Sequence, residues 1–215
     1  MKFKSLLALP LVIGLLSGCS GAYYSAMEQV GIHKRDILVD RVEEARDAQS
    51  EAQEQFQDAL EQFRSVVQFD GGELSKQYNS LKAEYDDSVS AAESVNSRID
   101  NVETVAEDLF EEWQQELTRY SNSKLRSQSA RKLQDTRRRY RQLLAKLQTA
   151  EKRMQPVLAT LQDNVLYLKH NLNARAVGEL KGEFQGIRQD ISLLVRDMQN
   201  AISESDAFIR EMEAG

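Results

Sequence analysis

Apolar residues recur over almost the whole chain after residue 35 in the spacing of a coiled coil, with alternating steps of four and three residues. An apolar side chain at every 3.5 positions forms a continuous seam along one side of an α-helix, and another helix must cover that seam. The spacing is strict from residue 36 to residue 68, where Gln49 is the only polar member. The members of this first seam are Leu38, Val42, Ala45, Gln49, Ala52, Phe56, Ala59, Phe63 and Val66.

Three further seams follow, separated by short turns, so we expect four helices, over Asp36–Gln68, Glu73–Tyr120, Lys124–His170 and Ala174–Met212. Turns this short make consecutive helices antiparallel. The sequence therefore predicts an all-α fold, an elongated antiparallel four-helix coiled-coil-like bundle over residues 36–215. A three-helix core with one peripheral helix is the alternative.

Details of the seams make the prediction more specific. Gly71 and Gly72 end the first helix, since glycine tolerates the left-handed geometry that follows a helix end. The second seam runs to Tyr120 and the third begins at Leu125. Pro156 removes a backbone donor inside the third helix, which predicts a kink there.

A layer of small residues is expected in the middle of the bundle. When the chain is folded at Gly71-Gly72, Ala45, Ala48 and Ala52 come level with Ala91, Ala92 and Val95. A second fold at Asn122 brings this layer to Met154 and Pro156. A flexible joint or a small cavity is one interpretation, but two helices that pack closer together is the one we favour. Close packing is also the favoured interpretation of Gly178, Gly182 and Gly186, which recur every four residues, and a site for a partner helix is the alternative.

Basic residues gather in the third helix and suggest, taken alone, a site for phosphate or acidic polymers. Folding at Asn122 places them opposite Glu103, Glu107, Asp108, Glu111 and Glu112, so interhelical ion pairs are the preferred explanation. The basic residues are Arg131, Lys132, Arg137, Arg138, Arg139 and Arg141.

Residues 1–18 have the features of an export signal. Lys2 and Lys4 precede an apolar run, Leu6–Leu16, which is too short to span a bilayer. Leu16, Ser17, Gly18 and Cys19 resemble the lipobox of bacterial lipoproteins. The resemblance implies a diacylglyceryl group on the Cys19 thiol, cleavage before Cys19, and usually acylation of the new amine by a chain such as palmitate.

The lipid would hold the protein to a membrane, with residues 19–35 as anchor and tether. Cys19 is the only cysteine, and lipidation accounts for a thiol that would otherwise be unpaired in an oxidising compartment. Ser20 follows it in place of the aspartate that, in the two-membrane sorting rule, retains lipoproteins at the inner membrane. By that analogy, the expected location is the inner leaflet of the outer membrane, facing the periplasm.

Charge and composition argue against several functions. Loss of Lys2 and Lys4 with the signal changes the formal net charge from −6 to −8, which disfavours binding to nucleic acid or adhesion to anionic lipid. His33 and His170 lack the spacing of metal ligands, and could approach one another only near one end of the bundle. No glycine-rich phosphate loop is present. We expect no catalytic residue, no cofactor and no metal.

Three segments carry a resemblance to a known family: Asp36–Val39, Asp108–Trp113 and Leu168–Ala174. They resemble a bacterial family named domain-of-unknown-function 2959, and the likeness extends over most of the chain after the signal. The resemblance implies no activity.

The leading expectation is a lipid-anchored, periplasm-facing helical scaffold or binding protein of the cell envelope, without catalysis. It would contact the membrane through Cys19 and bind an envelope protein that the sequence does not identify. A homo-oligomer is possible, because heptad seams also pair between chains. The alternatives are a membrane-active helical protein that exposes its seams to lipid, and a hydrolase that uses surface carboxylates.

Overall fold

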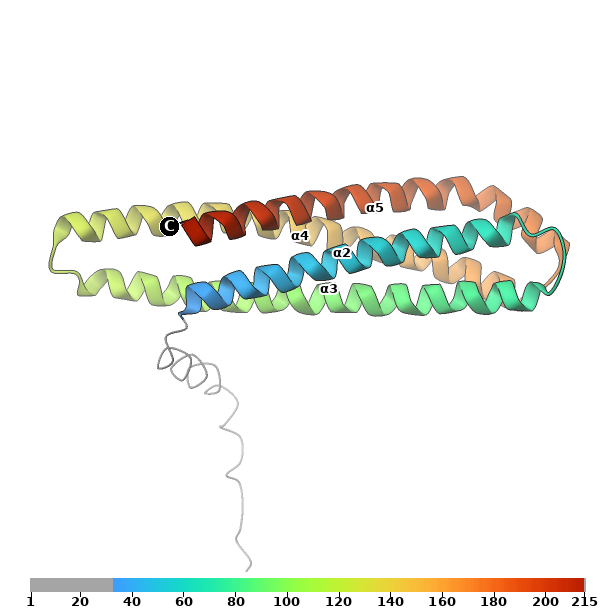
Figure 1. The fold of residues 1–215 in the computed structure, drawn as a ribbon, viewed down its shortest axis with the longest axis horizontal. Helices are drawn as coiled ribbons and strands as arrows, with labels where there is room; N and C mark the ends of the chain where they lie inside the picture. The colour runs from blue at the N-terminus through green and yellow to red at the C-terminus, as the bar shows by residue number, and fades with distance from the viewer. Residues whose placement is uncertain (1–32, 215) are drawn as a thin grey trace, which may run out of the picture.

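The computed structural model describes residues 33–214, and these form four long helices. They are α2 (Lys34–Val67), α3 (Leu74–Glu116), α4 (Ser123–His170) and α5 (Ala174–Ala214), with a short 3-10 turn, η1 (Leu117–Arg119), after α3. The helices follow one another up and down along a single long axis (Figure 1). The predicted signal, Cys19 and most of the tether lie outside the described residues.

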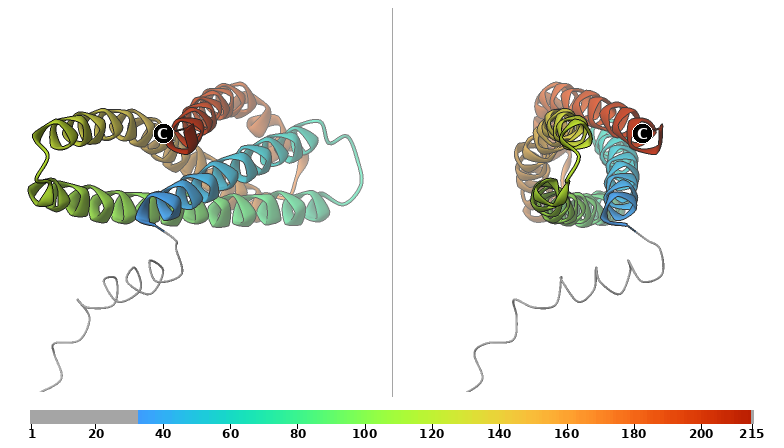
Figure 2. Two further views of the ribbon diagram at one scale, coloured as in Figure 1. Left: turned by 60° about the vertical axis from the view of Figure 1, so that its left-hand side comes forward. Right: turned by 90° about the vertical axis from the view of Figure 1, so that its left-hand side faces the viewer.

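Each helix packs against two neighbours in the order α2, α3, α4, α5 and back to α2. Seen along the bundle, the four helices stand around a common centre (Figure 2). The predicted four-helix bundle is thereby confirmed, in preference to a three-helix core with a peripheral helix. No helix in the described part of the chain combines the length and apolarity that crossing a membrane requires.

The observed helix boundaries differ little from the predicted ones. Residues in the turns explain where the helices begin and end. Gly72 adopts a positive φ of 111°, as predicted for the end of the first helix. Asn122 begins α4 as its N-cap. The Asn122 side-chain oxygen accepts hydrogen bonds from the backbone N–H groups of Lys124 at 2.9 Å and Leu125 at 3.2 Å. The largest difference is at the end of α3, which stops at Glu116 and not at Tyr120. Pro156 lies within an unbroken α4, and the kink stays a prediction.

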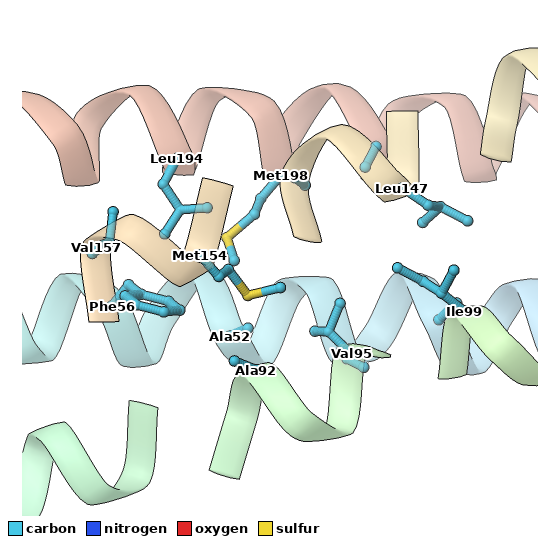
Figure 3. Close-up of a cluster of buried hydrophobic side chains, with 14 of the residues drawn as sticks. Ala52, Phe56, Ala92, Val95, Ile99, Leu147, Met154, Val157, Leu194 and Met198 are labelled. Atoms are coloured by element: carbon cyan, nitrogen blue, oxygen red, sulfur yellow. The ribbon is translucent and has the colours of Figure 1, made fainter. Parts of the chain in front are cut away.

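The predicted central layer is present and is filled by side chains from all four helices. Ala52 and Ala92 lie side by side there, and Met154 from α4 points toward them (Figure 3). Met198 from α5 occupies the same layer, so long flexible side chains meet the small ones. In contrast, the three glycines of α5 do not serve close packing: a Cβ atom added at Gly178, Gly182 or Gly186 would meet nothing within 4 Å.

Among the described residues, four polar residues are buried in the core, and three of them donate a hydrogen bond to a carbonyl of their own helix. Ser88 Oγ donates to Glu84 O at 2.7 Å, and the Asn164 side-chain amide donates to Thr160 O at 2.7 Å. Gln49 is fully buried, yet neither its nitrogen nor its oxygen forms a hydrogen bond within the described residues. This amide carries an unfavourable desolvation cost that an apolar residue would avoid.

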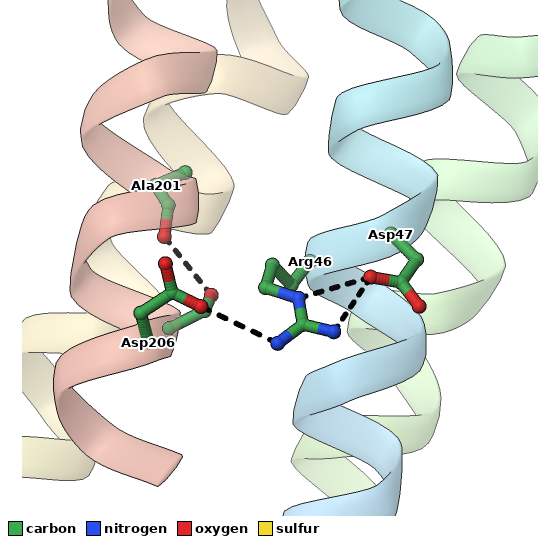
Figure 4. A network of polar contacts seen from close by, with 5 residues as sticks. Arg46, Asp47, Ala201 and Asp206 are labelled. Carbon is green, nitrogen blue, oxygen red and sulfur yellow. Dashed lines mark hydrogen bonds and ion pairs between the residues drawn. The ribbon is translucent and has the colours of Figure 1, made fainter. Parts of the chain in front are cut away.

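An ion-pair network fastens α2 to α5 on the surface. The Arg46 guanidinium donates to Asp47 at 2.8 and 2.9 Å and to Asp206 of α5 at 3.3 Å (Figure 4). The hydrogen bond to Asp47, with smaller effects from Asp206, raises the pKa of Arg46. Exposed pairs of this kind contribute little to stability and mainly favour one register.

Candidate functional site: a hollow at the open end of the bundle

The α3–α4 hairpin is longer than the two helices that pack against it. Figure 1 shows its turn projecting past the first residues of α2 and the last residues of α5. Two ion pairs mark where these partners stop: Lys34 at the start of α2 pairs with Glu112 at 2.8 Å, and Glu211 near the end of α5 pairs with Arg139. We call this the open end, and residues 117–126 the tip. At the opposite, closed end, the loops 68–73 and 171–173 join the helices.

Aromatic and polar contacts join α3 and α4 at the base of the projecting hairpin. Trp113 Nε1 donates to Ser129 Oγ at 2.8 Å. Phe110 and Tyr140 meet edge to face with their ring centroids 5.4 Å apart, a geometry that aromatic pairs prefer. The Arg137 guanidinium lies 5.5 Å from the centroid of the Phe110 ring, within the range of a cation–π contact. It also donates to the Phe110 carbonyl at 2.9 Å. These contacts keep α3 and α4 paired at the level where α2 begins and α5 ends.

A hollow of about 340 Å³ lies where α5 ends against this hairpin. Its apolar part comes from Trp113 and the last turns of α5, and its cations come mainly from α4. Because these elements are far apart in sequence, the hollow depends on the bundle being assembled. The lining residues are Arg35, Trp113, Gln128, Arg131, Lys132, Asp135, Thr136, Arg139, Phe208, Glu211 and Met212.

The predicted pairing of the basic cluster with acidic residues of α3 is wrong for the arginines whose contacts are described. Arg137 binds a backbone carbonyl and the Gln114 side chain of α3, and no carboxylate. Arg138 pairs with Asp135 of its own helix at 2.9 Å, and Arg139 pairs with Glu211 of α5. The prediction missed α5 as the competing partner, because both helices flank α4 at this level.

Neither of the two histidines lines this hollow. His33 precedes α2 at the open end and His170 ends α4 at the closed end, so the two histidines lie at opposite ends of the bundle. Within residues 33–214, no group of three His, Cys, Asp or Glu side chains is placed to hold a metal. Burial, with Glu103 and Glu107 nearby, raises the pKa of Tyr140, which packs into the core beside Phe110.

The hollow is suited to binding and was not foreseen from the sequence. Its mixture of aromatic, methionine and basic side chains fits a ligand or partner surface with an apolar part and a negative charge. A usable signal was present in the unequal lengths of the predicted helices. The first helix is much shorter than the second and the third. The hairpin formed by the second and third helices must therefore project beyond the first helix.

Comparison with known proteins gives the family of this chain. A family model described as "Protein of unknown function (DUF2959)" matches residues 23–212. None of the curated proteins matches the chain. The match covers all but a few residues of the bundle, and it agrees with the resemblance carried by the three segments noted in the sequence. The chain belongs to the DUF2959 family.

Proposed function

We propose that the protein is a lipid-anchored helical scaffold or binding protein of the cell envelope that faces the periplasm and acts without catalysis. One observation carries this proposal: the only cysteine of the chain directly follows Leu16-Ser17-Gly18, at the end of an export-signal pattern. Two or three long acyl chains hold a protein firmly, because each buried methylene contributes about 0.8 kcal/mol. Ser20 favours the inner leaflet of the outer membrane as the location.

The dimensions of the bundle support a scaffold that extends away from the membrane. The chain between Cys19 and Lys34 spans at most about 50 Å when fully extended, so α2 begins within that distance of a lipid on Cys19. The 48 residues of α4 correspond to about 72 Å of helix, which carries the closed end outward. The open end, with its hollow, then lies on the membrane side and the closed end lies deep in the periplasm.

The lipid anchor is tested by mass spectrometry of the chain isolated from membranes. We expect residues 1–18 to be absent and Cys19 to carry a diacylglyceryl group. A Cys19→Ser variant should keep its helical content but leave the membrane fraction. A bare Cys19 thiol on the wild-type protein would refute the anchor.

The binding role is tested separately, by photo-crosslinking in intact cells. One crosslinker replaces Gln128 in the hollow, and a matched one replaces the exposed Gln142, which is on the same helix. We expect an envelope component to be captured from position 128 and not from position 142. Equal capture at both positions, or none at either, would contradict binding at the hollow.

A further inference from the structure

We propose that the tip of the α3–α4 hairpin is a membrane-contacting element that binds anionic lipid headgroups through its α4 side. The inference deepens the proposed function and relies on the Cys19 anchor for its orientation, while the lipid contact itself depends only on described residues. The inference also restricts the earlier expectation that the negative net charge disfavours adhesion to anionic lipid, because that charge belongs to the whole chain and not to the tip.

Charge is segregated along the hairpin. The segment from residue 117 to residue 134 contains no Asp or Glu, although the formal net charge of the whole chain is −6. Lys124 and Arg126 of α4 are exposed and form no ion pair within the described part of the chain. Arg119 of η1 is also exposed and unpaired there, although it borders a hollow lined by acidic residues of α3. Unpaired cations gathered at one projecting point are the arrangement that anionic headgroups attract.

Apolar side chains accompany these cations. Among the described residues, four large hydrophobic side chains are strongly exposed, and two of them, Tyr120 (40%) and Leu125 (50%), belong to the tip. Tyrosine favours the headgroup level of a bilayer, and a leucine beside arginine or lysine inserts at the boundary with the acyl chains. Both residues continue the apolar seams past the point where α2 and α5 end, so no helix covers them.

Acidic residues behind the tip determine which side faces the lipid. Glu112 and Glu116 are in the last two turns of α3, eight and four residues before Tyr120. Glu112 is also paired with Lys34. On α4, the first acidic residue is Asp135, about 17 Å of helix beyond Lys124. Because charges interact over about 8 Å at physiological salt, contact along α4 keeps the carboxylates away from the headgroups.

The first helix, which follows the predicted anchor in the sequence, begins at the same end of the bundle as the tip. Lys34, the first residue of α2, contacts Glu112 of α3, a short distance behind the tip. A lipid on Cys19 would therefore hold the tip close to the bilayer and raise its effective concentration there. Weak intrinsic affinity of the tip then suffices to orient the bundle on the membrane.

The experiment uses the mature chain with Cys19→Ser, which keeps every helix and removes the acyl anchor. Sedimentation with vesicles of phosphatidylcholine plus phosphatidylglycerol is compared with sedimentation with phosphatidylcholine alone. Trp113 is the only tryptophan and lies beside the tip, so its fluorescence gives a second measure of contact. We expect binding to the anionic vesicles only, and loss of binding when salt is raised from about 50 mM to about 500 mM.

A triple variant, Arg119→Glu, Lys124→Glu and Arg126→Glu, should weaken this binding roughly 100-fold or more, because each cation contributes about fivefold. The matched control is Lys169→Glu, Arg175→Glu and Lys181→Glu, which changes the net charge equally but at the closed end. Circular dichroism verifies that both triples remain helical. The control should bind within about threefold of the unchanged chain, since its charges lie far beyond the screening length from the tip.

Several results would overturn the proposal. Equal loss in both triple variants would assign the effect to overall charge, and equal sedimentation with both lipid mixtures would exclude headgroup recognition. A wild-type dimer in light scattering that the tip triple abolishes, without vesicle binding, would make the tip an interface between copies. None of these results depends on lipidation, so failure here leaves the mass-spectrometric test of Cys19 independent.

Discussion

The two ends of the bundle have the same heptad sequence pattern but different surroundings. At the closed end, Phe63 of α2 is fully buried and stacks against Phe184 of α5, with centroids 6.2 Å apart. At the open end, only α3 and α4 continue, and Tyr120 and Leu125 are exposed although both are seam positions. A seam therefore predicts burial only where enough partner helices are present to cover it.

The difference also separates stability from function. The closed end joins all four helices through two short loops, and its apolar side chains are in a continuous core. The open end presents a hollow, a positive tip and exposed apolar side chains, which cost little stability there because two helices already pair. We therefore expect interaction surfaces at the open end. The rest of the bundle is expected to contribute most of the free energy of folding.

The largest predicted effect contrasts one seam residue from each end. Phe63→Ala should lower the free energy of unfolding by about 3–5 kcal/mol, because it leaves a cavity among four helices. Leu125→Ala, at the exposed seam position, should change it by no more than about 0.5 kcal/mol. Urea denaturation followed by circular dichroism measures both. Similar losses in the two variants would mean that something covers the tip in solution.

Gln49→Leu tests whether the four-helix region sets global stability. The Gln49 amide is buried without a hydrogen-bond partner within the described residues. Its removal should raise the free energy of unfolding by about 1–3 kcal/mol. The control is Gln128→Leu in the hollow, where an exposed side chain should alter stability by about 0.5 kcal/mol or less. A loss of stability in Gln49→Leu, measured by thermal denaturation, would show that the amide is satisfied after all.

The sequence was sufficient to predict the four helices, their order and the central layer around Ala52 and Met154. The periodicity of the apolar residues carries that information, because each seam residue shows which face of its helix is buried. The exposure of Tyr120 and Leu125 was missed, because it depends on where the other helices stop, and only the unequal lengths of the predicted helices indicated that. The partners of Arg137 and Arg139 were also missed, because long side chains choose among several neighbours within reach.

Trp113→Phe probes what holds the two-helix region together. The substitution keeps an aromatic ring but removes the N–H group that donates to Ser129. Loss of this hydrogen bond should cost about 0.5–1.5 kcal/mol in urea denaturation. Circular dichroism is the readout, since the variant has no tryptophan left. Ser129→Ala should cost a similar amount, and the double variant less than the sum of the two. Additive losses would indicate that the hydrogen bond is not formed in solution.

The smallest effect concerns the pair that ties the end of α5 to the hairpin. Arg139 and Glu211 have side chains that are 50% and 40% exposed. A double-mutant cycle with alanine should therefore give a coupling energy of only about 0.2–1 kcal/mol. Added salt should reduce this coupling energy, because dissolved ions screen exposed charges. Lys76 and Glu73, 2.9 Å apart within one chain segment at the closed end, provide the matched pair.

Hydrogen exchange in the last turns of α5 shows what the Arg139–Glu211 pair does for the hollow. If exchange there becomes faster only when this pair is broken, and not when the Lys76–Glu73 pair is broken, then the Arg139–Glu211 pair closes one wall of the hollow. Equal exchange in both variants would mean that Phe208 and Met212, which line the hollow from α5, hold that helix in place through packing alone. The open end would then keep its shape without the Arg139–Glu211 ion pair, and added salt would leave the hollow unchanged.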